Sequence, residues 1–261
     1  MSASSTNRAC TTLLIVFAVL SLPMLACELL LLDESMLLPL INATVVTCAL
    51  IALGSTVRVA LRGVRPGVPG FNALVLLALV TLLAGEIATW AREIMDLGDE
   101  IGLGPVNLLW IAGRVLVLAL FAQTLRAPRS GPAQARGRAV LLALVGSLVL
   151  GFGLFGVAFP MAEAHGGLDQ ALGPVLVIVL QALVLALVPV VYALGGLGSA
   201  RDHPQRRFTL LGLALYMATD QLLYHLSVIG REDIWVPELG YLAGYLLVAY
   251  GMLAADREPA A

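Results

Sequence analysis

Lysine is absent from this chain of 261 residues, and all of its basic residues are arginine. Without a lysine amine the chain can form no Schiff base, which excludes a retinal Schiff base and lysine-based covalent catalysis. Charged residues of both signs make up only 12% of the sequence, and the formal net charge is −2. The sequence contains no basic patch of the kind that binds nucleic acid, so we expect no nucleic-acid partner.

Cysteine is also scarce, and the three residues Cys10, Cys27 and Cys48 form no CxxC pair. Two of them fall in apolar runs, where a free buried thiol is the ordinary interpretation. A disulfide or metal framework is therefore not expected. The sequence shows no HExxH, P-loop or glycine-rich nucleotide motif, and no Ser-His-Asp set. We predict neither a cofactor nor a metal ion.

Hydrophobic residues, by contrast, make up 60% of the chain. A soluble domain of this length has too little interior to bury so much apolar surface, and the chain therefore belongs in a bilayer. Each membrane span needs about 20 apolar residues. We predict an all-α polytopic membrane protein, one integral domain over 1–261, with eight transmembrane helices near 11–32, 38–60, 71–92, 105–125, 139–161, 173–194, 208–229 and 236–254.

The connections between these segments alternate in charge, which predicts the orientation. Arginines cluster between the second and third, the fourth and fifth, and the sixth and seventh segments, and single arginines, Arg8 and Arg257, lie before the first segment and after the eighth. The other connections hold the acids, and only Arg92 and Arg231 fall on that side. Because cytoplasmic loops are rich in arginine, we expect both termini in the cytoplasm, in a bacterial inner membrane.

Two pairs of segments suggest an internal duplication. Residues 82–90 (LLAGEIATW) align with 216–224 (YMATDQLLY), and 110–117 (WIAGRVLV) align with 241–248 (YLAGYLLV). The two offsets are nearly equal, as expected for a repeat. We predict two halves, about 1–130 and 131–261. Each would hold four spans, an even number, so the repeats should be parallel and related by an axis along the membrane normal.

Two carboxyls lie inside apolar runs, where such groups are costly and mark candidate sites. At a rise of ~1.5 Å per residue, Glu86 lies about 9 Å and Arg114 about 14 Å from the outer ends of neighbouring segments. We therefore predict an ion pair between them, which could serve structure alone. In the second half Tyr245 replaces Arg114, so we expect Asp220 to lack a cation and to be partly protonated.

Two carboxyls in different surroundings can divide acid and base roles between them. The candidate catalytic residues are Asp220 and Glu86, with Arg114, Tyr241, Tyr245 and His225 in supporting positions. Two structural alternatives stay open. Asp220 could be a neutral carboxyl hydrogen-bonded to one of the tyrosines without any chemistry, and His225 could be an ordinary interfacial histidine.

The chain resembles the YhhN/lysoplasmalogenase-like family of eight-span membrane proteins over nearly its whole length. The similarity is carried by short motifs: 215–220 (LYMATD), 240–247 (GYLAGYLL), 84–86 (AGE), 39–40 (PL) and 173–176 (GPVL). The resemblance implies an eight-helix fold and hydrolysis of the vinyl ether bond of lysoplasmalogens, with the two acids central. The chain departs from the family at Glu86, where the family has Asp, and at Leu38, where the family often has Lys.

Three functions are compatible with these features. The first is an intramembrane hydrolase whose partner is a membrane lysolipid. The second is a small proton-coupled transporter in which the acids relay protons. The third is a membrane sensor or assembly protein without catalysis. Few polar residues in the second, fifth and sixth segments disfavour the carrier, and the short segment after 254 offers no output domain for a sensor.

Overall fold

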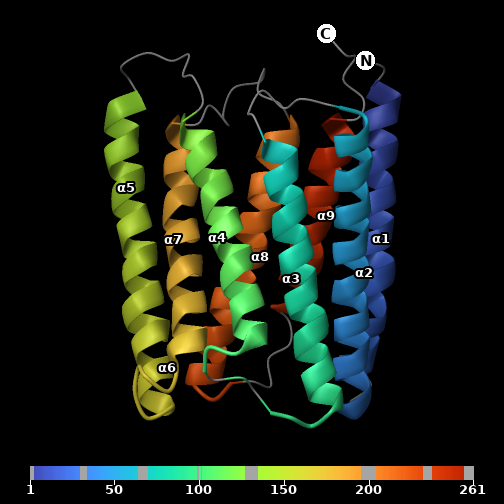
Figure 1. Cartoon of the computed structure of the whole chain (residues 1–261). Helices are drawn as coiled ribbons and strands as arrows, with labels where there is room; N and C mark the ends of the chain where they lie inside the picture. The colour runs from blue at the N-terminus through green and yellow to red at the C-terminus, as the bar shows by residue number, and fades with distance from the viewer. Residues whose placement is uncertain are drawn as a thin grey trace.

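The computed structural model describes residues 3–29, 34–63, 70–98, 100, 102–126, 135–194, 204–231 and 237–255. Within these ranges the regular structure is entirely helical, and the helices stand side by side as one upright bundle (Figure 1). The segments are α1 (Ala3–Leu29), α2 (Glu34–Leu61), α3 (Phe71–Ile94), α4 (Pro105–Arg126), α5 (Ala135–Gly151), η1 (Phe152–Ala158), α6 (Phe159–Ala164), α7 (Leu172–Leu194), α8 (Pro204–Val228) and α9 (Glu238–Ala255).

Five of the described helices are long and apolar enough to cross a membrane, as expected for an integral membrane protein: Pro39–Leu61, Phe71–Ile94, Pro105–Leu125, Leu142–Ala164 and Leu172–Tyr192. The apolar stretches of α1 and α9 are shorter. α8 is less apolar because its first turn carries Gln205, Arg206 and Arg207 and its second half carries Asp220, Gln221 and His225. The prediction of eight spans therefore stays a prediction for these three helices.

Glycine and proline set several helix ends where the sequence predicted them. Gly70 has a φ of 71°, a left-handed conformation that glycine adopts without strain, and α3 begins directly after it. Pro105 starts α4, where its missing N–H removes no helical hydrogen bond. Gly98, with a φ of 64°, lies in the connection between these two helices.

The predicted span 139–161 is one continuous helical segment made of three parts, since a π-helical stretch, η1, separates α5 from α6. Pro160 lacks an N–H and cannot bond the carbonyl of Gly156 four residues earlier. The N–H of Phe159 reaches back five residues to the carbonyl of Leu154 instead. The freed carbonyl of Gly156 lies 3.1 Å from Nδ1 of His225 on α8.

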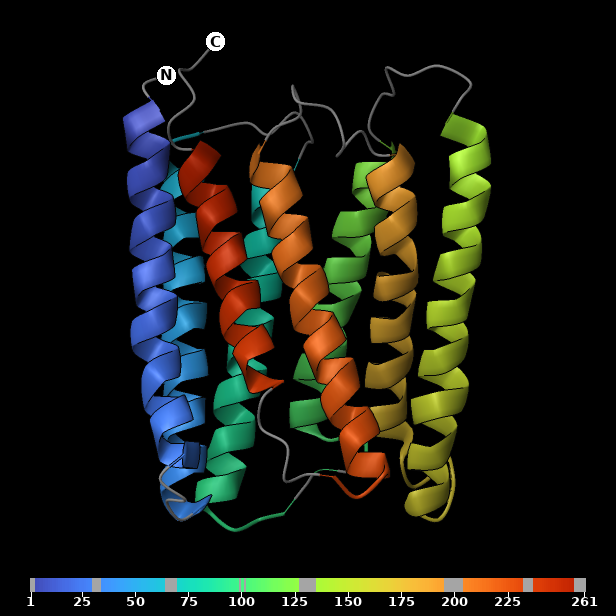
Figure 2. The ribbon, with the colours of Figure 1, turned by 180° about the vertical axis from the view of Figure 1, so that it is seen from behind.

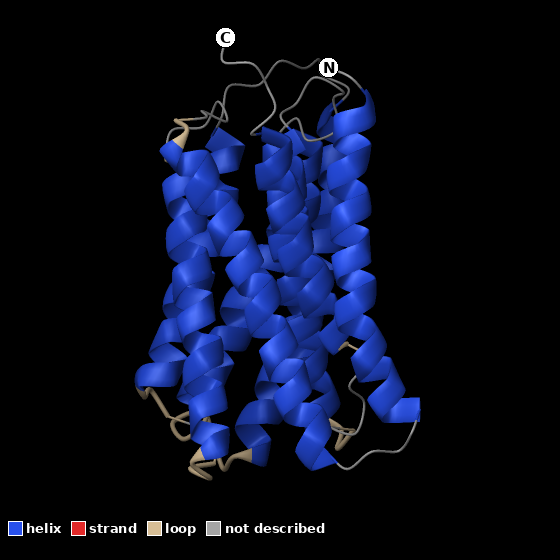
Figure 3. Cartoon of the chain, turned by 90° about the vertical axis from the view of Figure 1, so that its right-hand side faces the viewer, coloured by secondary structure: helices blue, strands red, loops and turns tan. Residues whose placement is uncertain are grey.

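The helices connect up and down, so that α1 begins and α9 ends at the same end of the bundle (Figure 1). α3 packs between α2 and α4, α4 packs against α7, and α9 packs against both α8 and α2. The axes run nearly along the bundle, with the described loops at its two ends (Figure 3). We call the end that holds Glu93, Asp96 and Glu100 the acidic end, and the opposite end, with Arg58 and Arg207, the arginine-rich end.

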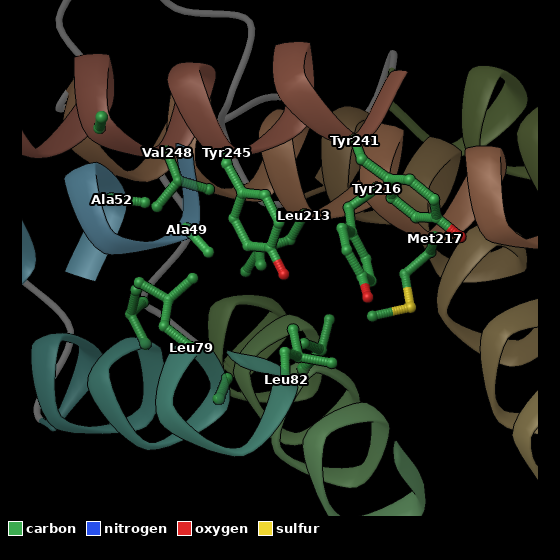
Figure 4. Packing of buried hydrophobic residues seen from close by; sticks show 14 of the residues in the cluster. Ala49, Ala52, Leu79, Leu82, Leu213, Tyr216, Met217, Tyr241, Tyr245 and Val248 are labelled. Carbon is green, nitrogen blue, oxygen red and sulfur yellow. The ribbon is translucent and has the colours of Figure 1, made fainter. Parts of the chain in front are cut away.

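The core lies between α2, α3, α8 and α9 and is filled by leucine, alanine and aromatic side chains (Figure 4). α8 and α9 approach closely where Gly212 faces Gly244. A Cβ on Gly212 would lie 2.5 Å from the carbonyl oxygen of Gly244, so the contact requires glycine. Close packing through small residues is typical of membrane helices. It brings the tyrosines of α9 against the face of α8 that carries Asp220.

Candidate functional site

The carboxylate of Asp220 accepts three hydrogen bonds from three other helices. Arg114 of α4 and Gln181 of α7 both donate to Oδ2. The hydroxyl of Tyr241 of α9 donates to Oδ1 at 2.5 Å. The Arg114 side chain is 1% exposed and that of Asp220 14% exposed, so water screens this ion pair little. The site joins both halves of the chain and fixes the carboxyl group of Asp220 at one position.

The predicted pairing of Glu86 with Arg114 is wrong, and so is the expectation that Asp220 lacks a cation. The sequence argument paired Arg114 with the acid of its neighbour in the chain, α3. In the bundle α4 also packs against α7, and the side chain of Arg114 reaches Asp220 of α8. Because Asp220 has a cation and two further donors, its role as the acid that first protonates the substrate is not supported.

Arg114 is held in place by Trp110, one turn earlier on α4. The guanidinium carbon lies 4.6 Å from the centre of the indole ring, and Nη1 donates to the carbonyl of Trp110 at 3.1 Å. The indole N–H in turn donates to Oγ1 of Thr89 on α3 at 3.3 Å. Gly85 of α3 leaves room for the ring, since a Cβ there would lie 2.9 Å from it. These contacts orient the guanidinium toward Asp220.

Glu86 occupies a neighbouring position with a different partner. Its Oε1 accepts a hydrogen bond of 3.0 Å from the hydroxyl of Tyr216 on α8. The ring of Tyr216 lies 4.9 Å from that of Tyr241 and 5.2 Å from that of Tyr245 (Figure 4). Two adjacent tyrosines therefore connect the two predicted acids. Tyr241, and not Tyr245, is the tyrosine that bonds Asp220.

A pocket of about 940 Å³ extends from the acidic end inward to Asp220. The connection between α3 and α4 borders it through Asp96, Gly98 and Glu100. Its walls include Trp110, Pro174, Leu223 and Tyr224 among apolar and aromatic groups, and Arg92, Glu93, His165 and Glu238 among charged or titratable ones. Of the two predicted acids, Asp220 lines this pocket, whereas Glu86 is not among its lining residues.

Two residues of the site were not predicted. Gln181 is the only polar side chain in the middle of the very apolar α7, and a lone amide at that depth was a usable signal. Glu238, the first residue of α9, also lines the pocket with Asp220. No feature of the local sequence separates it from a solvent-exposed acid at a helix end.

His225, predicted as a supporting residue, is not among the residues that line the pocket. Its Nδ1 lies against the carbonyl of Gly156, and its ring meets the edge of Phe152 at 5.1 Å. A carbonyl accepts a hydrogen bond, so Nδ1 must donate the proton. These contacts give His225 a structural part in joining α8 to the π-helical stretch.

The chain has no significant match among known family models, curated proteins or solved structures.

Proposed function

We propose that this protein is an intramembrane hydrolase that cleaves a lysolipid, with the vinyl ether of a lysoplasmalogen as the substrate that the YhhN-like resemblance suggests. The observation that carries the proposal is the Asp220 carboxylate, held by three donors at the inner end of a pocket inside the bundle. A carboxylate held in a fixed position stabilises positive charge as it develops in a reaction.

The chemistry of a vinyl ether fits such a carboxylate. Protonation at carbon converts the ether into an oxocarbenium ion, which water then attacks. An ionised Asp220 can stabilise this cation and take the proton of the attacking water. Arg114, Gln181 and Tyr241 keep the carboxylate in position. Glu86 contacts this arrangement through Tyr216 and serves as a supporting acid.

We further propose that the chain spans the membrane eight times as two parallel repeats of four helices. The packing of the helices supports this arrangement, because α2 packs against α9 as α7 packs against α4. α3 and α4 also pair as α8 and α9 do. A rotation of about 180° around the membrane normal would bring the α2–α9 contact onto the α7–α4 contact, and the α3–α4 pair onto the α8–α9 pair. With the arginine-rich end in the cytoplasm, the pocket opens on the outer side.

The test of the hydrolase is aldehyde release from a lysoplasmalogen by the purified protein in detergent micelles. Asp220→Asn should lower turnover by roughly 10²-fold or more, the scale of an acid–base group. The matched control is Asp169→Asn in the exposed connection between α6 and α7, which should keep full turnover. Full activity of Asp220→Asn would remove Asp220 from the mechanism.

One observation favours a second candidate, a proton-coupled carrier. Tyr216 and Tyr241 lie ring to ring, and each hydroxyl bonds a carboxylate, so polar groups continue from the pocket to Glu86. Carboxyls connected in this way inside a membrane can relay protons. Proton flux in liposomes, together with no aldehyde release by the unmutated protein, would favour the carrier over the hydrolase.

A further inference from the structure

Glu238 occupies an unusual place, because α9 begins inside the bundle. α8 has 25 residues and α9 has 18, a difference of about 10 Å in length. Figure 2 shows the first turn of α9 ending well short of the lower ends of α3 and α8. The side chain of Glu238 lies in the pocket wall, together with Asp220.

The charges near Glu238 are mostly negative. The acids that interact with it are Glu86 and Glu93 of α3 and Asp220 of α8. Among the residues that the structure describes, Glu238 has no hydrogen-bond or ion-pair partner.

The nearby cations are occupied elsewhere. Arg114 is paired with Asp220. Arg92, at the wall of the same pocket, donates to the carbonyls of Leu97 and Gly98 at 3.1–3.2 Å and lies 4.0 Å from Glu100. The two pocket carboxyls thus differ in their surroundings, since Asp220 is fixed beside Arg114 and Glu238 has no cation partner. Such a contrast separates a base from an acid.

We propose that Glu238 is the catalytic residue that donates the proton in the hydrolysis of the vinyl ether. This inference rests on the proposed hydrolase function. It departs from the sequence-based assignment, in which Asp220 was the acid. Glu86 is a poorer candidate, because it is not among the lining residues of the pocket and its carboxyl accepts the hydroxyl of Tyr216.

Both carboxyls return to their starting protonation states at the end of the reaction. Glu238 gives its proton to the double-bond carbon that does not carry the ether oxygen. The O–H bond of Glu238 breaks, and the π electrons of the double bond form the new C–H bond. The resulting oxocarbenium ion lies beside the Asp220 carboxylate. Water adds to the carbon next to the ether oxygen, and Asp220 takes one proton of the water. The hemiacetal then breaks its C–O bond, with the proton of Asp220 passing to the leaving oxygen and the hydroxyl proton returning to Glu238. The products are an aldehyde and an alcohol.

The test compares Glu238→Gln with Glu163→Gln, an exposed glutamate at the same end that is not among the lining residues of the pocket. Glu238→Gln should lower kcat by roughly 10²–10⁴-fold with little change in KM, because an amide cannot donate a proton from oxygen. Glu163→Gln should match the unmutated protein. Glu238→Asp should keep part of the activity, with a pH profile shifted from that of the unmutated protein.

A structural role of Glu238 would not produce chemical rescue. In Glu238→Ala, added acetic acid should restore turnover in proportion to its concentration, since a small acid can enter the vacated space and donate the proton. Full turnover in Glu238→Gln with an unchanged pH profile would overturn the inference while leaving the hydrolase in place. A folded but inactive Glu238→Ala that acetic acid does not restore would also count against it. If the unmutated protein releases no aldehyde, the proposed function fails, and this inference fails with it.

Discussion

The ion pair between Arg114 and Asp220 makes the interior sensitive to the loss of either partner, and Arg114→Leu is the change that measures this sensitivity. The variant leaves a carboxylate inside the bundle with only Gln181 and Tyr241 to bond it. Removing one partner of a buried pair typically costs about 3–5 kcal/mol, because the other charge remains without compensation. The contact with the ring of Trp110 is lost as well, which adds up to about 2 kcal/mol.

The pairing itself is measured by a double-mutant cycle. Asp220→Asn alone leaves the guanidinium uncompensated and should cost a similar amount, whereas the double variant removes both charges. We expect a coupling free energy of at least about 2 kcal/mol, near the upper end for residues in contact. The assay is the free energy of unfolding in mixed micelles, from titration with a denaturing detergent. The same cycle with Glu86→Gln in place of Asp220→Asn should show the smaller coupling.

Additive losses for Arg114→Leu and Asp220→Asn would refute the pairing. A larger coupling with Glu86 than with Asp220 would restore the pairing expected from the sequence and reverse the assignment of the ionised carboxyl.

Two further predictions concern packing and orientation. Gly85→Ala should destabilise the protein by about 1–3 kcal/mol because the new Cβ meets the ring of Trp110 at 2.9 Å. Gly54→Ala, with open space around it, should instead stabilise the protein by up to about 1 kcal/mol through helix propensity. Thermal unfolding of the two variants side by side is the check, and equal shifts would contradict the close contact. Single cysteines at the exposed Leu61 and Leu97, in a background without native cysteines, should be labelled from opposite sides of the membrane, and labelling of both from one side would disprove the proposed topology.

Much of the fold could be predicted because the bilayer imposes a simple pattern on the sequence. Long apolar runs bounded by Gly70 and Pro105 give α3 and α4 within about two residues of their observed ends. The π-helical stretch was not predicted, since a proline in an apolar run indicates a local break and not the form that the break takes. The carbonyl that Pro160 releases finds its partner, His225, on a helix far along the chain.

The site was predicted in part, for a related reason. Asp220 and Arg114 stand out because charges within apolar runs are rare, and the structure brings both into one site. Their pairing depends on which helices pack together, which the local sequence does not specify. Glu238 differs from an ordinary acid at a helix end only because α9 begins inside the bundle, and that depth is a property of the whole assembly.

The central claim is that a carboxylate-lined pocket in the bundle hydrolyses a vinyl ether through protonation at carbon, and the isotopic composition of the product tests it most directly. In D₂O, the purified protein in micelles with a lysoplasmalogen should release an aldehyde that carries one deuterium on the carbon next to the carbonyl. Asp220→Asn should release little of this deuterated aldehyde, and Asp169→Asn should release as much of it as the unmutated protein does. An aldehyde without that deuterium, or none from the folded unmutated protein, would contradict the claim.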